Sequence, residues 1–133
     1  MAFLIPLVAA IAPFLVWPIE TLLPYPYIVE EVLKAGLILF VIDIHSKSLQ
    51  VKLATSAGAL FAFSETILFI FNLSLKGDIS TLLSRLLLTT LLHAGTFLII
   101  LIPTFKNRWL IIPGLGAAII IHYFFNLAAN SIS

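Results

Sequence analysis

The sequence predicts an all-α fold: one polytopic transmembrane bundle of about five helices, forming a single domain over residues 1–133. Three observations predict this class. Hydrophobic residues make up 62% of the chain, and the mean hydropathy is +1.19. Several apolar runs follow one another along the chain. Their lengths are close to the ~20 residues that a helix needs to cross the hydrocarbon core. The segments between these runs are too short to form a folded domain outside a membrane.

The predicted helices cover residues 2–23, 27–44, 52–74, 80–103 and 109–129. The first run lacks a basic leader, and its Ala10-Ile11-Ala12 is followed directly by Pro13. We therefore expect a retained helix rather than a cleaved signal peptide. The second helix opens after Pro24 and Pro26.

The third predicted helix carries Ala54, Gly58 and Ala62 at four-residue spacing. Such a stripe of small residues lets another helix approach closely. The fourth predicted helix ends at Pro103, and the fifth starts near Trp109.

Basic residues near the helix ends set the expected orientation. The side that shares the N-terminus carries four of them: Lys47, Lys52, Lys106 and Arg108. The opposite side carries Lys76, joined by Arg85 if that side chain snorkels to the interface. Because basic residues concentrate on the cytoplasmic side, we expect the N-terminus to lie in the cytoplasm. We further expect an integral protein of a prokaryotic cytoplasmic membrane.

The charge of the chain also bears on its partners. A net charge of +1, with no room for an extramembrane domain, excludes a nucleic acid partner. The expected partners are the lipid bilayer and a membrane protein or peptide substrate. Assembly into a homo-oligomer is a further possibility. Four acidic or imidazole residues near helix ends are expected to be solvated: Glu20, Asp43, His45 and Asp78.

The candidates for function are the ionisable residues inside the apolar segments: Glu30, Glu31, Lys34, Glu65, His93 and His122. A charge in hydrocarbon costs at least ~2.5–3.5 kcal/mol on insertion scales, so such residues usually face the protein interior. At a rise of ~1.5 Å per residue, these side chains from four helices fall in one half of the membrane. The sequence therefore predicts that they converge on one polar cavity.

On the second predicted helix, Glu30 and Glu31 both lie one turn from Lys34. One lysine can offset one carboxylate and leave the other free to act as a general base. The alternative is a structural ion pair that fixes this helix to a neighbour.

Two histidines and a carboxylate, namely His93, His122 and Glu65, would satisfy a catalytic zinc site that keeps an open position for water. A metal-free mechanism is equally open. His122 and Asn126 lie four residues apart on one helix face, which suits a metal ligand with its orienting partner or two donors to an oxyanion.

These motifs, in this order on successive helices, resemble the four motifs of the PrsW family of intramembrane proteases. The matching positions are Glu30-Glu31-x-x-Lys34, Phe61-x-x-x-Glu65, His93 and His122-x-x-x-Asn126, spread over roughly residues 25–130. That family belongs to the superfamily of CAAX-processing and bacteriocin-processing (CPBP/ABI) membrane proteases. Glutamate rather than histidine in the second motif favours the PrsW branch over the CAAX branch.

The resemblance implies an endopeptidase that cleaves membrane proteins or peptides. It implies that Glu30 and Glu31 hold and activate the attacking water, and that Lys34 and Phe61 contact the substrate. The implied catalytic partners or metal ligands are Glu65, His93 and His122, with Asn126 assisting His122.

Two other functions stay open. One is a non-catalytic scaffold, like the gamma-secretase subunit APH-1, which is regarded as a distant relative of this family. The other is a small transporter or proton relay, because chains of intramembrane Glu and His also serve there. A protease needs a water-accessible pocket with unsatisfied groups, whereas a scaffold can satisfy every polar group internally.

Overall fold

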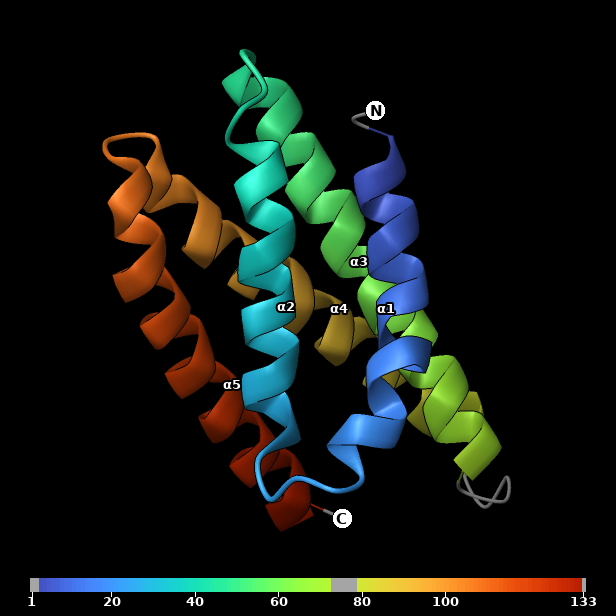
Figure 1. Cartoon of the computed structure of the whole chain (residues 1–133). Helices are drawn as coiled ribbons and strands as arrows, with labels where there is room; N and C mark the ends of the chain where they lie inside the picture. The colour runs from blue at the N-terminus through green and yellow to red at the C-terminus, as the bar shows by residue number, and fades with distance from the viewer. Residues whose placement is uncertain (1–2, 73–78, 133) are drawn as a thin grey trace.

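The computed structural model describes residues 3–72 and 79–132. Within these ranges it contains α1 (Leu4–Glu20), α2 (Pro26–Val41), α3 (Lys47–Asn72), α4 (Ile79–Thr104) and α5 (Ile111–Ile132), with a short 3-10 turn η1 (Arg108–Leu110) before α5. The described part of the chain holds no strand, so the predicted all-α class is confirmed (Figure 1).

The third helix begins at Lys47 rather than at residue 52, where the apolar run suggested its start. Ser46 explains the difference. Its hydroxyl oxygen accepts a hydrogen bond from the Leu49 amide, and its carbonyl accepts one from the Gln50 amide. A serine in this role satisfies amide groups that the first turn of a helix leaves free, so the helix extends through a polar segment.

Successive helices run in opposite directions (Figure 1). The N-terminus, the connection between α2 and α3, and the turn before α5 lie at one end of the bundle, and the connection between α1 and α2 lies at the other end with the C-terminus. The connections rich in lysine and arginine therefore share an end with the N-terminus, as the alternation of helices predicted.

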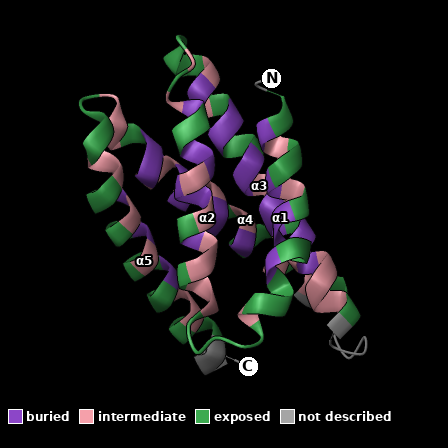
Figure 2. Cartoon of the chain, in the orientation of Figure 1, coloured by how far each residue is buried: buried purple, intermediate pink, exposed green. Residues whose placement is uncertain are grey.

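Among the described residues, α3, α4 and α5 contain stretches long and apolar enough to cross a membrane: Lys47–Phe71, Leu82–Thr104 and Arg108–Ala129. With 17 and 16 residues, α1 and α2 are shorter than the ~20 that span the hydrocarbon core. Of the five predicted spans, three thus have the required length. Large apolar side chains are exposed on the outward faces, which fits a membrane environment (Figure 2).

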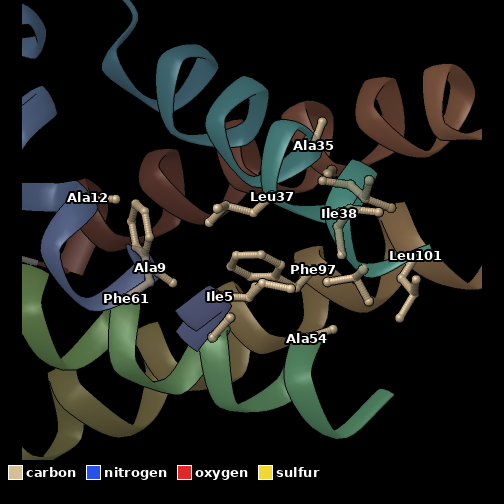
Figure 3. Packing of buried hydrophobic residues seen from close by; sticks show 14 residues of the cluster. Ile5, Ala9, Ala12, Ala35, Leu37, Ile38, Ala54, Phe61, Phe97 and Leu101 are labelled. Atoms are coloured by element: carbon tan, nitrogen blue, oxygen red, sulfur yellow. The ribbon is translucent and has the colours of Figure 1, made fainter. Parts of the chain in front are cut away.

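The core lies where α1, α2 and α4 meet α3. Phe61, Phe97, Ile38 and Leu101 fill it, and small side chains such as Ala9 let the helices approach (Figure 3). The second helix contacts each of the other four helices. This central position explains how a helix with three ionisable residues can be accommodated, because neighbouring helices cover it.

The predicted stripe of small residues on α3 lies against α4. A Cβ atom at Gly58 would come within 2.5 Å of the Ala94 Cα atom and 2.8 Å of the His93 carbonyl carbon. We expect Gly58→Ala to lower the free energy of unfolding by about 1–3 kcal/mol, because two helix backbones would have to separate. Titration of detergent-solubilised protein with SDS measures this quantity.

Gly36→Ala is the matched control, since a Cβ at Gly36 meets nothing within 4 Å. Alanine is a better helix former than glycine by about 1 kcal/mol, so this variant should be at least as stable as the wild type. Equal stability of the Gly58 and Gly36 variants would show that α3 and α4 do not pack as described.

The arrangement of the ends makes the orientation testable. A reporter that is active only in the cytoplasm, fused after the last residue, should give no signal, because basic residues gather at the opposite end. The same reporter fused ahead of Met1 should be active. Signal from the C-terminal fusion would reverse the orientation.

Candidate functional site

The first part of the site is a buried network around Glu31. The Lys34 Nζ atom lies 2.6 Å from Glu31 Oε1 and donates a further hydrogen bond of 3.1 Å to Thr96 Oγ1 on α4. The His122 Nδ1 atom, on α5, lies 2.7 Å from the same Glu31 oxygen. The Glu31 and Lys34 side chains have no exposed surface. The Glu31–Lys34 pair thus joins α2 to α5 through Glu31 and to α4 through Lys34, and the predicted one-turn pairing is present.

The second part is centred on Glu65 of α3. The Glu65 Oε2 atom lies 2.5 Å from His93 Nε2, and Glu65 Oε1 lies 3.4 Å from an Arg85 amino group. The Arg85 guanidinium lies 3.8 Å from the centroid of the Phe69 ring. Glu65 therefore has two partners on α4, one of them inside the bundle and one near its surface.

Glu30 joins the two parts. Its Oε2 atom lies 3.9 Å from His122 Nε2, and its carboxylate forms a group with Glu65 and His93 whose candidate ligand atoms all lie within 4.8 Å of one another. The rings of His93 and His122 are 5.4 Å apart between centroids. The structure thus brings together both glutamates of α2, Glu65 and the two histidines, from four helices, as the sequence predicted. The predicted convergence on one cavity holds only for Glu30 and Glu65, since the other three residues do not line it.

Some polar atoms at this junction have no bonding partner among the described residues. These buried atoms include Glu30 Oε2, Glu31 Oε2 and His93 Nδ1. Leaving such a group unpaired costs roughly 1–3 kcal/mol. Water or a ligand could supply the missing hydrogen bonds.

A cavity of about 320 Å³ opens beside the cluster, between α1, α2 and α3. Its walls include three carboxylates and three aromatic side chains: Glu20, Glu30, Glu65, Trp17, Phe61 and Phe69. Its volume is at the lower end of the range for small-molecule sites, and it can hold a side chain with several waters. Glu30 and Glu65 therefore line a space that a ligand can enter.

Lys34 and Phe61 were predicted to contact substrate. Phe61 is among the residues around the cavity, but its side chain is only 1% exposed and belongs to the core, so its contact with substrate stays a prediction. Lys34 is not placed for this role, because it is wholly buried and its ammonium group is held by Glu31 and Thr96. Lys34 is therefore better described as the residue that positions Glu31.

Asn126 was predicted to assist His122. It lies one turn further along α5 and is half-buried, yet in the described part of the structure it makes no hydrogen bond to the cluster. The imidazole of His122 is oriented by Glu31 on another helix instead. Spacing along one helix could not reveal a partner on another.

Two residues of the site, Glu20 and Arg85, were not predicted from the sequence. Glu20 was expected to be solvated, but it lines the cavity and its Oε1 atom is buried. Asp43 and His45, for which the same was expected, are exposed, and Asp78 lies outside the described residues.

Arg85 was considered only as a residue that could snorkel to the interface, whereas the structure pairs it with Glu65. Arg85, Thr89 and His93 follow each other at four-residue spacing on α4, and this shared face was the available signal for Arg85.

The metal set also differs from the prediction. The residues expected to hold zinc were Glu65, His93 and His122, whereas the described residues that could hold an ion together are Glu30, Glu65 and His93. His122 is not part of this group, although its Nε2 atom lies 3.9 Å from Glu30 Oε2. Carboxylate and imidazole groups are ordinary zinc ligands, so this donor set fits the metal chemically.

The chain matches no protein-family model, no curated protein and no solved structure. The fold and the site define a small helical bundle that has three membrane-length helices and a buried centre of carboxylates and histidines.

Proposed function

We propose that this chain is an intramembrane endopeptidase in which Glu30 activates the attacking water. The observation that carries the proposal is the gap between Glu30 Oε2 and His122 Nε2. The two atoms are 3.9 Å apart, and the glutamate oxygen has no hydrogen-bond partner among the described residues. This separation is too long for a direct hydrogen bond; a water about 2.8 Å from both atoms would bridge them, and the side chains around the buried Glu30 Oε2 atom would have to move to admit it.

The neighbouring groups are arranged to orient such a water. With its Nδ1–H donated to Glu31, His122 presents the lone pair of Nε2 toward Glu30. The water would donate one hydrogen to each acceptor, so its own lone pairs would face away from both. Lys34 holds the Glu31 carboxylate in place through its own hydrogen bond to Glu31 Oε1.

The chemistry is a hydrolysis. Glu30 takes a proton from the water as the water oxygen bonds to the carbonyl carbon, and the carbonyl electrons move onto its oxygen. When the carbon–nitrogen bond breaks, Glu30 returns the proton to the leaving nitrogen. The Glu65–His93 pair lies beside this position.

A zinc ion would supply Lewis-acid activation of water if one were bound by Glu30, Glu65 and His93. We expect cleavage to survive dialysis against a zinc chelator, because the guanidinium of Arg85 and the ammonium of Lys34 already offset carboxylates of the cluster. Loss of activity on chelation, restored by added zinc, would instead assign these three residues to a metal.

The other two functions make different predictions. A scaffold does not require the open cavity or the unpaired oxygen of Glu30. A proton relay would use the neighbouring Glu31, His122, Glu30 and Glu65 as a path, and it would make liposomes containing the protein permeable to protons.

The experiment that tests the proposal uses purified protein in liposomes with a pool of synthetic single-span peptides of varied sequence. Mass spectrometry of the peptides should reveal new fragments with the wild type, and none with protein heated beyond unfolding. If the peptides are not cleaved but protons leak into the liposomes, the protein would be assigned as a proton relay. If neither cleavage nor a proton leak is seen, the scaffold function would be favoured.

A further inference from the structure

Glu20 is the carboxylate of the cavity that the proposed hydrolysis does not use. It is the last residue of α1, and its side chain lines the cavity beside Trp17 and across from α2 and α3. Its Oε1 atom is buried and has no hydrogen-bond partner among the described residues. No lysine, arginine or histidine in the described ranges forms an ion pair with it.

The charges around the cavity do not balance. Glu65 is met by His93 and Arg85, and Glu31 is met by Lys34 and His122 behind the cavity wall. Glu30 has only His122 at 3.9 Å, and Glu20 has no such partner at all, although burial of a carboxylate oxygen without a partner is costly. The cavity therefore lacks a positive charge at the wall formed by the end of α1.

The wall beside Glu20 suits the body of a long cationic side chain. Trp17, which is 40% exposed, provides apolar surface, and the face of an aromatic ring also attracts a cation. Phe61 is only 1% exposed, and the Arg85 guanidinium already lies over the ring of Phe69. Lysine and arginine combine an apolar stem with a charged end. Such a side chain can lie against Trp17 while its end donates hydrogen bonds to Glu20.

We propose that Glu20 determines specificity by binding the lysine or arginine side chain of a substrate next to the bond that is cleaved. This inference rests on the proposed endopeptidase function and names its substrate class. A neutral side chain would leave Glu20 without a partner, and an acidic one would be repelled.

Trp17 offers a direct readout of binding. The chain has two tryptophans, and the other, Trp109, lies in η1 at the opposite end of the bundle and is 71% exposed. In a Trp109→Phe protein, the emission of Trp17 should change on titration with an apolar peptide that carries one central lysine. Matched peptides with norleucine or glutamate at that position should bind about 10–100-fold more weakly. Equal dissociation constants for the lysine and norleucine peptides would overturn the inference, and this comparison needs no change at Glu20.

In the same background, Glu20→Gln should remove the preference for lysine, while Asp43→Asn, an exposed carboxylate away from the cavity, should retain it. Preference that persists in Glu20→Gln would also overturn the inference.

Binding and cleavage are measured separately. Tight binding of the lysine peptide without cleavage would contradict the endopeptidase function and leave recognition by Glu20 intact. Cleavage without a preference for lysine would support the endopeptidase function and contradict recognition by Glu20.

Discussion

Glu30→Gln is expected to lower kcat/KM for peptide cleavage by about 10²–10⁴-fold, the usual contribution of a general base. Glutamine has nearly the same shape as glutamate but cannot accept a proton from water at neutral pH. Glu30 makes no hydrogen bond to a described residue through Oε2, so its replacement removes little from the folded state. The rates should be measured in liposomes, together with the free energy of unfolding of each variant.

Asp43→Asn is the control for the removal of a carboxylate, because Asp43 is exposed in the connection between α2 and α3. It should cleave at the wild-type rate. Full activity of Glu30→Gln would exclude Glu30 as the base. An inactive variant that is also unfolded would assign Glu30 a structural role instead.

Lys34→Met is expected to cause the largest loss of stability, about 3–5 kcal/mol, because it removes one partner of a fully buried ion pair. The carboxylate of Glu31 would then keep only His122 as a partner. Combining it with Glu31→Gln removes both charges, and the double variant should recover much of the lost free energy. SDS titration of all three variants measures the coupling between the two positions.

Lys52→Met provides the matched control, since Lys52 lies on α3 and is exposed. It should change the free energy of unfolding by less than about 0.5 kcal/mol. If Lys34→Met were equally mild, the pair of Lys34 and Glu31 would not be buried as described. If the double variant were no more stable than the single ones, the two residues would act independently.

The sequence was sufficient to predict the helices and the inward position of Glu30, Glu31 and Lys34, because long apolar runs and the high cost of charge in hydrocarbon leave few alternatives. It could not predict which glutamate of α2 is engaged. That depends on the rotation of α5, which directs His122 Nδ1 to Glu31 and leaves Glu30 Oε2 open.

The roles of Glu20 and Arg85 were missed for a related reason. Both lie toward helix ends, where solvation or snorkelling is the ordinary outcome. The structure instead places Glu20 on a cavity wall and Arg85 at Glu65, through the packing of α3 against α1 and α4. Contacts of this kind depend on crossing angles between helices, which hydrophobic periodicity along one helix does not specify.

The most direct test of the central proposal follows the oxygen of the attacking water. Wild-type protein in liposomes is incubated with lysine-containing single-span peptides in water labelled with the heavy oxygen isotope, and the fragments are weighed by mass spectrometry. If Glu30 activates water for hydrolysis, each new carboxyl terminus should carry one labelled oxygen, and Glu30→Gln should give no such fragments. Absence of labelled fragments from the wild type, or equal amounts from Glu30→Gln, would contradict the proposal.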